Sequence, residues 1–335
     1  MQPGLVLVVG ANGVGKTNLL EAVHVATQGF SPRTRTDSQV VRFGAEGARA
    51  AVIGRRGEVR LELEVTVRRG EGKRARLNGA PLRAAEQLRT MVSTLVFTPD
   101  RLGVVKGPPA SRRAYFDRVL GRLAPARAPL SAEYGAAVAQ RNAALRRAAA
   151  NASSRAAVEP WSERVAALGA ELVAARLEVL ALLAPSFATR AAELGLDDVS
   201  LRYEGEPPTP ESLAAAFERD LERGVTSLGP HLDDIVLAAA SRDLRNFGSQ
   251  GEQRLALLAL LLAEAETIAE RTGVLPLLLL DDVLSELDPG RRRILAARVR
   301  SAGQALVTAT DAAMLPAAPD QLLEVTPGMV LETAA

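Results

Sequence analysis

Cysteine is absent from this 335-residue sequence, and histidine is nearly so, because only His24 and His231 occur. The lack of cysteine excludes disulfides, thiolate metal sites and cysteine nucleophiles, and it fits a reducing cytosol. Two isolated imidazoles argue against a histidine metal cluster, and a Ser-His-Asp triad would depend on one of them. The chemistry of this chain must therefore rest on other residues.

Aromatic residues and excess charge are also scarce. Phe, Trp and Tyr make up 3% of the sequence, and 41 Lys and Arg face 39 Asp and Glu, for a formal net charge of +2. The net charge of the whole chain therefore does not indicate a polyanionic partner, and any basic surface must be local. The start lacks the pattern of a secretory signal, and the most apolar stretch, residues 255–263, is too short to span a bilayer. We interpret that stretch as a buried helix.

Hydrophobic periodicity divides the chain into segments of different structure. A continuous apolar run at residues 5–9 predicts a strand buried on both faces, and residues 17–28 have helical spacing. Alternation of apolar and charged residues from 50 to 82 predicts an antiparallel sheet with one exposed face. Residues 111–223 predict a helical insertion, and the last third alternates helices and strands. Strands from both ends of the chain therefore join one sheet in an α/β fold.

The most specific motif follows the first predicted strand. Residues 10–17 read GANGVGKT and fit G-x-x-x-x-G-K-[ST] between a strand and a helix. Backbone N–H groups and the helix N-terminus hold phosphates in this motif, while the lysine reaches the outer phosphates and the hydroxyl ligates Mg²⁺. A glycine-rich turn with a solvated lysine is the alternative, which the strand-to-helix position disfavours. The predicted binding residues for ATP and Mg²⁺ are Gly10, Ala11, Asn12, Gly13, Val14, Gly15, Lys16, Thr17 and Asn18.

Two adjacent carboxylates end the apolar strand predicted at residues 275–280. Asp281 can hold Mg²⁺ together with Thr17, while Asp282 can polarise the attacking water. Adjacent like charges are costly without a cation. Considered alone, a solvated strand end explains the pair equally well. Paired with the P-loop, the residues predict catalysis by Asp281, Asp282 and Lys16.

The long apolar helix is preceded by Ser249, Gln250, Gly251 and Glu252. A helix start of this kind is an anion site, although a plain N-cap with Glu252 as its capping-box partner explains the same residues. Ser285 and Asp288 come just after the aspartate pair. This order resembles the signature motif, Walker B element and D-loop of ABC ATPases. The resemblance implies that the signature completes the nucleotide site of a second copy, so that ATP closes a homodimer.

Three further strings resemble the RecF family of bacterial recombinational repair ATPases. They are GKTNLLEA at residues 15–22, the segment from FTPD to the arginine pair at residues 97–113, and GPHLDD at residues 229–234. The resemblance covers nearly the whole chain. It implies an ABC-type ATPase head with a mixed sheet and an antiparallel β subdomain, formed by residues 1–108 and 226–335. Residues 109–225 would form an inserted, mainly helical second lobe.

The same resemblance implies a function. We expect a weak, DNA-stimulated ATPase that dimerises on ATP, binds duplex DNA and its junctions with single-stranded gaps, and supports RecA loading together with RecR and RecO. Slow hydrolysis would release the DNA, and the setting would be replication, recombination and SOS repair in the cytoplasm. Two alternatives remain: a nucleotide-binding subunit of an ABC transporter, and a nucleotide-loaded scaffold that scarcely hydrolyses ATP.

The chain departs from the family patterns at three points. Only nine residues precede Gly10, where RecF chains usually have a further strand segment. Thr98 occupies the place of the Q-loop glutamine, and Thr308 and Thr310 stand where a switch histidine is expected. We therefore predict slow hydrolysis, in which a threonine hydroxyl still positions water.

Basic residues concentrate in the predicted antiparallel sheet. Phosphate contacts need guanidinium density but no particular sequence. Glutamates interleave with the arginines, so a solvated, ion-paired face explains them equally well. Arg112 and Arg113 are likewise compatible with ion pairs inside the chain. Because aromatic residues are few, backbone contacts to duplex are favoured over base stacking. The predicted DNA contacts are Arg55, Arg56, Arg68, Arg69, Lys73 and Arg74.

Overall fold

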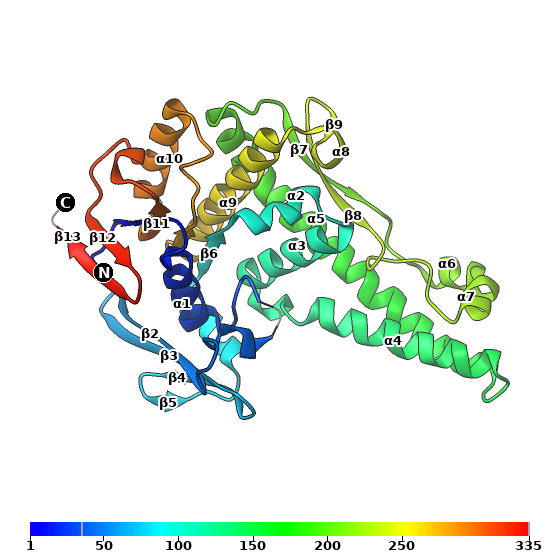
Figure 1. Ribbon diagram of the computed structural model, residues 1–335. Helices are drawn as coiled ribbons and strands as arrows, with labels where there is room; N and C mark the ends of the chain where they lie inside the picture. The colour runs from blue at the N-terminus through cyan, green and yellow to red at the C-terminus, as the bar shows by residue number, and fades with distance from the viewer. Residues whose placement is uncertain (35, 334–335) are drawn as a thin grey trace. The chain divides into compact units, whose positions relative to one another are not determined.

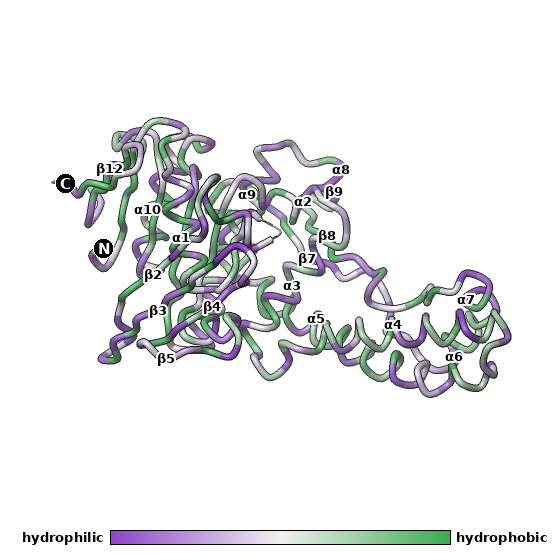
Figure 2. Tube along the Cα trace, turned by 60° about the horizontal axis from the view of Figure 1, so that its bottom comes forward, coloured by the Kyte–Doolittle hydropathy of each residue, from purple (hydrophilic) through white to green (hydrophobic). Residues whose placement is uncertain are grey.

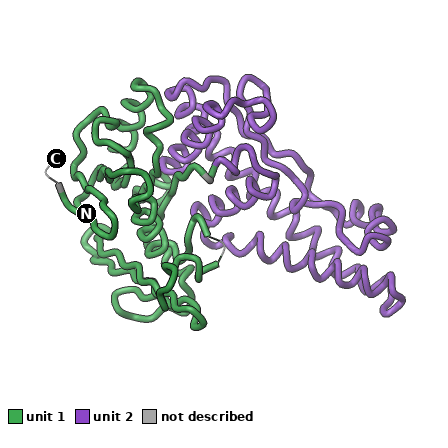
Figure 3. Tube along the Cα trace, in the orientation of Figure 1, with its two compact units in different colours: residues 1–101, 268–335 green, residues 102–267 purple. Residues whose placement is uncertain are grey.

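The computed structural model describes residues 1–34 and 36–333. The chain divides into two compact units (Figure 3). Unit 1 comprises Met1–Arg101 and Ile268–Ala335, and unit 2 comprises Leu102–Thr267. The two ends of the chain thus build one unit, as the apolar strands near both ends predict.

A six-stranded sheet forms the centre of unit 1, in the order β13-β12-β1-β11-β10-β6 over the part of the chain that the structure describes. Its strands are β1 (Leu5–Val9), β6 (Thr94–Phe97), β10 (Leu277–Leu280), β11 (Ala305–Ala309), β12 (Gln321–Thr326) and β13 (Met329–Thr333). All neighbouring strands from β12 to β6 are parallel, and only β13 is antiparallel. The carboxyl ends of the parallel strands therefore meet at one edge, where ligands bind in open α/β sheets.

Helices cover this sheet and fix its core. The helices of unit 1 are α1 (Lys16–Gln28), α10 (Pro289–Ser301) and the short 3₁₀ turns η1 (Asp37–Val40), η2 (Ala85–Thr90), η3 (Pro99–Leu102) and η6 (Ala312–Met314). Helix α1 lies against the six-stranded sheet (Figure 1), and its Leu20 and Val23 pack in one cluster with Val6 and Val8 of β1. Leu20 and Val23 are three residues apart, so both face the sheet from the same side of α1. The amino end of the helix follows directly on the loop after β1.

A second, antiparallel sheet in unit 1 has the order β2-β3-β4-β5. Its strands are β2 (Gly47–Arg56), β3 (Val59–Arg68), β4 (Gly72–Leu77) and β5 (Ala80–Pro81). Hydropathy alternates along β3 (Figure 2), and its apolar side chains Leu63, Val65 and Val67 pack with Val25 of α1. The predicted half-exposed sheet is therefore present, with the charged side chains of β3 on the opposite face.

Unit 2 is mainly helical, with a small antiparallel sheet in the order β7-β8-β9. Its elements are α2 (Gly103–Lys106), α3 (Pro109–Leu123), η4 (Pro125–Arg127), α4 (Leu130–Ala149), η5 (Arg155–Val158), α5 (Glu159–Glu193), β7 (Val199–Glu204), α6 (Pro210–Ala215), α7 (Phe217–Arg223), β8 (Asp234–Ala239), β9 (Arg242–Asp243), α8 (Leu244–Phe247) and α9 (Gln250–Thr272), which continues past the end of the unit. Residues 255–263 lie within α9 and are almost fully buried, as predicted. No helix in the described chain is long and apolar enough to cross a membrane.

The helical prediction for residues 111–223 is wrong at β7. This strand alternates Val199, Leu201 and Tyr203 with polar residues, and it pairs with β8 from Val199 opposite Ala239 to Glu204 opposite Asp234. A six-residue alternation is hard to recognise inside a long Ala- and Leu-rich region. Unit 2 runs from Leu102 to Thr267, whereas the predicted lobe runs from residue 109 to 225. The division into ATPase head and inserted lobe stays a prediction.

Candidate nucleotide-binding site

The P-loop joins β1 to α1, in the predicted order of strand, loop and helix. Gly15 is the N-cap of α1 with φ 115°, and a Cβ there would meet no atom within 4 Å, so glycine serves the backbone conformation rather than the space. At Gly10, a Cβ would stand 2.5 Å from the carbonyl oxygen of Val325 in β12. The first turn of α1 holds no acidic side chain. The loop therefore leads into a helix N-terminus whose own first turn carries no acidic side chain, a setting that favours an anion.

Lys16 lies over the loop that precedes it. Its Nζ donates to the carbonyl oxygens of Gly10 at 2.6 Å and Ala11 at 3.0 Å, and the residue is only 8% exposed. Neutral carbonyls accept weaker hydrogen bonds from an ammonium group than phosphate oxygens do. A bound nucleotide can therefore draw the ammonium from these carbonyls, as the predicted role of Lys16 requires.

Thr17 and Asp281 meet at the carboxyl edge of the sheet. The Thr17 hydroxyl donates to the Asp281 carboxylate, 2.9 Å from Oδ2 and 3.1 Å from Oδ1, and Asp281 is 5% exposed. Hydroxyl and carboxylate oxygens are ligands that Mg²⁺ prefers, so these residues fit the cation. Within the described residues, no group of three or more His, Cys, Asp or Glu side chains is placed to hold a metal ion. Phosphate and water oxygens would complete the coordination of a cation here.

Asp282 adopts an unusual backbone conformation at the turn after β10. Its φ is +49°, in the left-handed region, and the Ser285 hydroxyl donates to its carbonyl oxygen at 2.9 Å. Its Oδ1 is buried and has no hydrogen-bond partner among the described residues. A buried carboxylate oxygen without a partner costs free energy unless a ligand or water uses it. The side chain is therefore available to a water, although its catalytic role stays a prediction.

Thr98, Thr308 and Thr310, which stand where the family patterns have a Q-loop glutamine and a switch histidine, lie in different environments. Thr98 follows β6, is 4% exposed, and its hydroxyl has no partner in the described chain. Thr308 lies in β11 and is fully buried beside the aspartate pair. Thr310 is exposed, and its hydroxyl donates to the sulfur of Met314. Thr308 therefore belongs to the site, whereas Thr310 faces solvent.

The predicted signature forms the start of α9 in unit 2. The Ser249 N–H donates to Glu252 Oε2 at 2.7 Å, and the Glu252 N–H donates to Ser249 Oγ at 3.2 Å. Hydrogen bonds to the carboxylate from the backbone N–H and the side chain of Ser249 hold the pKa of Glu252 below its ordinary value. The capping box is thus real, and Ser249, Gln250 and Gly251 are exposed. The cap leaves a helix N-terminus open to solvent, so contact with a partner's nucleotide stays a prediction.

The predicted D-loop follows Asp282 in unit 1. Ser285 and Asp288 are both exposed. Asp288 is the N-cap of α10, and its carboxylate accepts from the Arg291 N–H at 3.0 Å. This backbone hydrogen bond holds the pKa of Asp288 below its ordinary value. The segment is therefore anchored at its carboxyl end, with Ser285 and Asp288 exposed and Leu287 buried.

Two of the family strings bind each other inside unit 2. Arg112 is 2% exposed and donates through Nε and Nη2 to the two carboxylate oxygens of Asp234, at 2.7 and 2.6 Å. Arg113 donates to the carbonyl oxygen of Asp233 at 2.6 Å. Burial raises the pKa of Asp234, but the hydrogen bonds from Arg112 and the Ile235 N–H, together with the charge of Arg112, keep the pKa below its ordinary value. Both arginines are therefore engaged within the chain.

The strand period sorts the predicted DNA contacts by face. Arg55, Arg68 and Arg74 lie on the outer face of the antiparallel sheet, opposite the buried side chains of β3. Arg56 lies on the same face as the buried side chains and donates to the carbonyl oxygen of Met91. Lys73 is mostly buried and pairs with Asp37 and Glu86, while Arg69 lies in the turn after β3.

Arg49, Arg60 and Arg76 also lie on this outer face, and of these Arg49 and Arg60 were not recognised from the sequence as candidates. Arg49 is neutralised by Glu64, with Nε 2.9 Å from Oε2. Arg55 and Arg60 stand directly opposite each other in the β2–β3 register. Like charges in such positions are destabilising without a counter-charge. Alternate residues of a strand lie on opposite faces of the sheet, and this alternation could have assigned these arginines to the outer face from the sequence.

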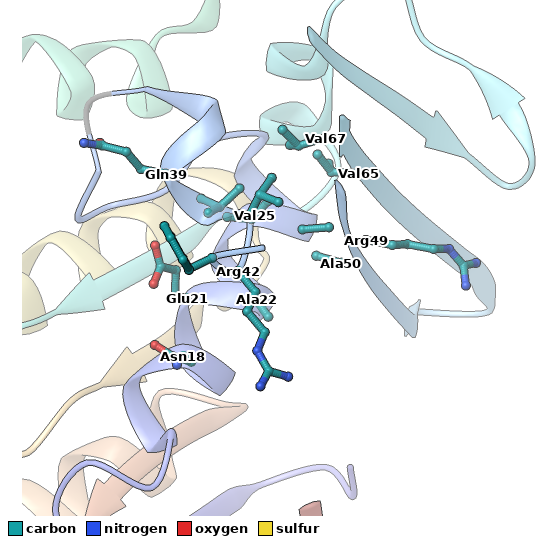
Figure 4. A pocket seen from close by; sticks show the side chains of 14 residues that line it. Asn18, Glu21, Ala22, Val25, Gln39, Arg42, Arg49, Ala50, Val65 and Val67 are labelled. Atoms are coloured by element: carbon teal, nitrogen blue, oxygen red, sulfur yellow. The ribbon is translucent and has the colours of Figure 1, made fainter. Parts of the chain in front are cut away.

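A cleft lies beside the P-loop helix in unit 1 (Figure 4). Asn18, Glu21 and Ala22 of α1 form one wall, and Val65 and Val67 of β3 lie across from them. The 98% exposed ring of Phe43 belongs to its rim. The predicted nucleotide contact Asn18 therefore faces open space next to Thr17.

Comparison with known proteins identifies the family. The family model for the RecF/RecN/SMC N-terminal domain matches residues 1–329. The DNA replication and repair protein RecF of Symbiobacterium thermophilum is 38% identical over 327 residues, covering 92% of this chain and 86% of that protein. RecF of Kineococcus radiotolerans is 39% identical over 355 residues, covering 95% and 90%.

Solved structures agree in fold. The ATP complex of a recombination mediator protein RecF of the RecFOR pathway superposes with a TM-score of 0.90 at 26% identity, covering all of this chain and 92% of that chain. The Smc head of Pyrococcus furiosus gives 0.58 at 19% identity, covering 99% and 90%, and shows the fold alone. The expected ABC-type head fold is confirmed, and the chain belongs to the RecF family of ATPases.

Proposed function

We propose that this chain is an ATP-dependent DNA-binding protein of replication and repair. ATP closes two copies into a dimer, the dimer binds duplex DNA near single-stranded gaps, and slow hydrolysis releases it. The observation that carries the proposal is the meeting of Thr17, Asp281 and Asp282 at the carboxyl edge of the parallel sheet.

The chain's own residues divide the chemistry of hydrolysis. The P-loop N–H groups and Lys16 hold the phosphates, and Thr17 and Asp281 are the protein ligands for Mg²⁺. When bound, Mg²⁺ neutralises charge on the β- and γ-phosphates. Asp282 orients a water for in-line attack on the γ-phosphorus, so that the bond to the bridging oxygen breaks and ADP and phosphate are released. The unpartnered Oδ1 of Asp282 supports this role.

Dimerisation follows from what one chain leaves exposed. Ser249 and Gly251 present a helix N-terminus, and Ser285 and Asp288 form an exposed segment beside the nucleotide site. A second copy whose signature reaches the γ-phosphate would use both surfaces. ATP binding and dimerisation are then one linked equilibrium, because the ligand binds only the closed state tightly.

Local charge supports DNA as the partner. Residues 42–76 contain ten basic and five acidic side chains, a net charge of +5, whereas the whole chain has +2. The like-charged pair Arg55 and Arg60 would be relieved by a phosphate group. We infer that the outer face of the antiparallel sheet contacts the duplex backbone. DNA contact at this face would stimulate hydrolysis.

Partners follow from the family. The solved relatives are described as recombination mediators of the RecFOR pathway. By this relationship, we propose that the chain works with RecR and RecO to support RecA loading, in recombination and the SOS response, in the cytoplasm where the DNA lies. A transporter subunit is not favoured, because the curated relatives described above are DNA replication and repair proteins. The scaffold alternative leaves the free Asp282 oxygen unexplained.

A charge-removal experiment tests the DNA surface. The double variant Arg55→Gln/Arg60→Gln should bind duplex DNA about 10-fold more weakly in ATP and Mg²⁺, and its salt slope should fall by about 2, because two phosphate contacts are lost. The matched control is Arg147→Gln/Arg223→Gln, which removes two exposed arginines from helices of unit 2. Affinity is measured by fluorescence anisotropy between 50 and 200 mM salt, conditions over which phosphate contacts dominate.

The outcomes separate the surface from the function. If both double variants lose affinity equally, the antiparallel sheet is not the DNA surface. If the unaltered protein shows no ATP-dependent binding to duplex, the proposed function itself fails.

A further inference from the structure

One buried side chain connects both aspartates at the carboxyl edge of the sheet. Thr308 lies in β11, whose Val307 pairs with Leu280 of β10, so Thr308 comes level with Asp281. Its hydroxyl donates to Asp281 Oδ1 at 2.8 Å and accepts from the Asp282 N–H at 2.8 Å. The residue is fully buried. A single hydroxyl therefore contacts the side chain of one aspartate and the backbone of the other.

The first bond fixes the carboxylate that would hold the cation. Asp281 Oδ1 receives Thr308 from one side and Thr17 from the other. When Thr17 turns to a cation, it can no longer donate to Asp281. Thr308 is not itself a predicted ligand, so it can keep donating to Asp281 when the carboxylate holds a cation. Carboxylates that ligate metal ions depend on such outer hydrogen bonds for their orientation.

The second bond fixes the turn that carries the other aspartate. Asp282 has φ +49°, a conformation that costs about 1 kcal/mol for a residue with a Cβ. The Asp282 N–H bonds to a side chain of β11, whereas the preceding Asp281 N–H donates to the carbonyl oxygen of Phe97 in β6. The strand thus departs from its regular pairing at Asp282. Thr308 stabilises that departure and thereby sets the direction of the Asp282 side chain.

We propose that Thr308 is the positioning residue of the hydrolytic site, holding the Asp281 carboxylate for the cation and the Asp282 turn for the water. The proposal rests on the proposed roles of these two aspartates. It also assigns a task to the position where a switch histidine was expected: Thr308 acts through the aspartates, and no contact with nucleotide is needed. A hydroxyl that both donates and accepts is required, because the two bonds have opposite direction.

Three substitutions test the proposal. Thr308→Val keeps the shape and removes both bonds, and Thr308→Ser keeps a hydroxyl. The matched control is Thr94→Val, because Thr94 is also fully buried, starts β6 at the opposite edge of the same sheet, and donates one hydroxyl bond to Thr27 at 2.9 Å. The measurements on the full chain are ATP affinity without divalent cation, the Mg²⁺ concentration at half-saturation of nucleotide binding, ATP turnover, and the melting temperature.

The expected result is specific to Thr308. Thr308→Val should weaken Mg²⁺-dependent nucleotide binding or turnover about 10- to 100-fold, the range for outer partners of metal ligands, with metal-free ATP affinity changed less than about 2-fold. Thr308→Ser should restore most of the loss. Thr94→Val should lose stability but keep turnover and Mg²⁺ dependence, because its bond lies away from the aspartates.

Other results overturn the proposal. If Thr308→Val and Thr94→Val lose only stability and to the same extent, Thr308 is a packing residue. If Thr308→Ser behaves like Thr308→Val, the hydroxyl is not the operative group. If the unaltered protein does not hydrolyse ATP, the proposed function fails at that step, and the Mg²⁺ dependence of nucleotide binding still decides the role of Thr308.

Discussion

Single residues at the ends of parallel strands account for the chemistry of this chain. Thr17 of α1 and Thr308 of β11 both donate to the carboxylate of Asp281, which follows β10. Parallel pairing brings the carboxyl ends of β1, β10 and β11 to one edge, so residues far apart in sequence meet there. Small shifts in register would separate them, because adjacent residues of a strand point to opposite faces.

His231 illustrates a residue whose role is structural and whose protonation is measurable. Its Nε2–H donates to the carbonyl oxygen of Thr226 at 3.1 Å, and Nδ1 accepts from the Tyr134 hydroxyl at 2.8 Å. Burial lowers the pKa of His231, the Thr226 carbonyl opposes this, and nearby Arg113 adds to the lowering. The folded protein therefore disfavours the charged imidazole.

The lowered pKa predicts a loss of stability in mild acid. Above pH 6.5, the ordinary pKa of histidine, the imidazole is neutral in both states and stability is full. As the pH falls below that value, the unfolded chain binds a proton that the folded chain does not, so the unfolding free energy falls. The variant His231→Gln should lose less of its melting temperature between pH 7.5 and 5.5. An equal loss in both proteins would contradict the assignment.

At the scale of elements, the arginine pair and the GPHLDD segment join α3 to β8 within unit 2. Arg112→Ala removes both bonds to Asp234 and those to the carbonyl oxygens of Val105 and Gly107. We expect a loss of about 3 kcal/mol in unfolding free energy, because the partner carboxylate is left partly buried. Urea denaturation measures it.

An exposed ion pair is the control for this loss. Arg155→Ala removes the pair with Glu218, in which both side chains are more than half exposed. Exposed pairs contribute about 1 kcal/mol or less. Similar losses for Arg112→Ala and Arg155→Ala would show that the join between α3 and β8 contributes little to stability.

The start of α9 allows its cap and its signature role to be separated. Ser249→Asp and Ser249→Asn both retain an N-cap acceptor, so each should stay within about 1 kcal/mol of the original stability. Only the aspartate places a negative charge where the γ-phosphate of a partner's nucleotide would lie. Sedimentation in ATP and Mg²⁺ should therefore show a dimer for Ser249→Asn and a monomer for Ser249→Asp. Dimers of both variants would leave Ser249 as a cap alone.

Sequence patterns predicted the elements better than the contacts between them. The P-loop, the aspartate strand and the alternating sheet were recognised because each has its own local period or motif. The strand β7 was missed because its pairing partner β8 lies 30 residues later. The roles of Arg56 and Lys73 depend on which face each strand buries, and that of Thr308 depends on the register between β10 and β11. Long-range pairing of this kind leaves no local signal.

At the scale of the whole molecule, the proposed function links three properties in one cycle. If the nucleotide site of one copy needs the signature of another, as proposed, ATP binding and dimerisation are coupled. The net positive charge is concentrated in the segment of the antiparallel sheet, because residues 42–76 carry +5 whereas the whole chain carries +2. A dimer carries that face twice, and two linked weak contacts bind DNA more tightly than one. ATP state would thereby control how long the protein stays on DNA.

The most direct test of this cycle is the sedimentation mass of the protein, with and without ATP and Mg²⁺, in the presence and absence of gapped duplex DNA. The control is Lys16→Ala, which removes the ammonium that lies inside the P-loop. We predict that ATP converts the unaltered protein to a DNA-bound dimer and leaves Lys16→Ala a monomer free of DNA. An unaltered protein that binds ATP yet remains a monomer without DNA would contradict the account.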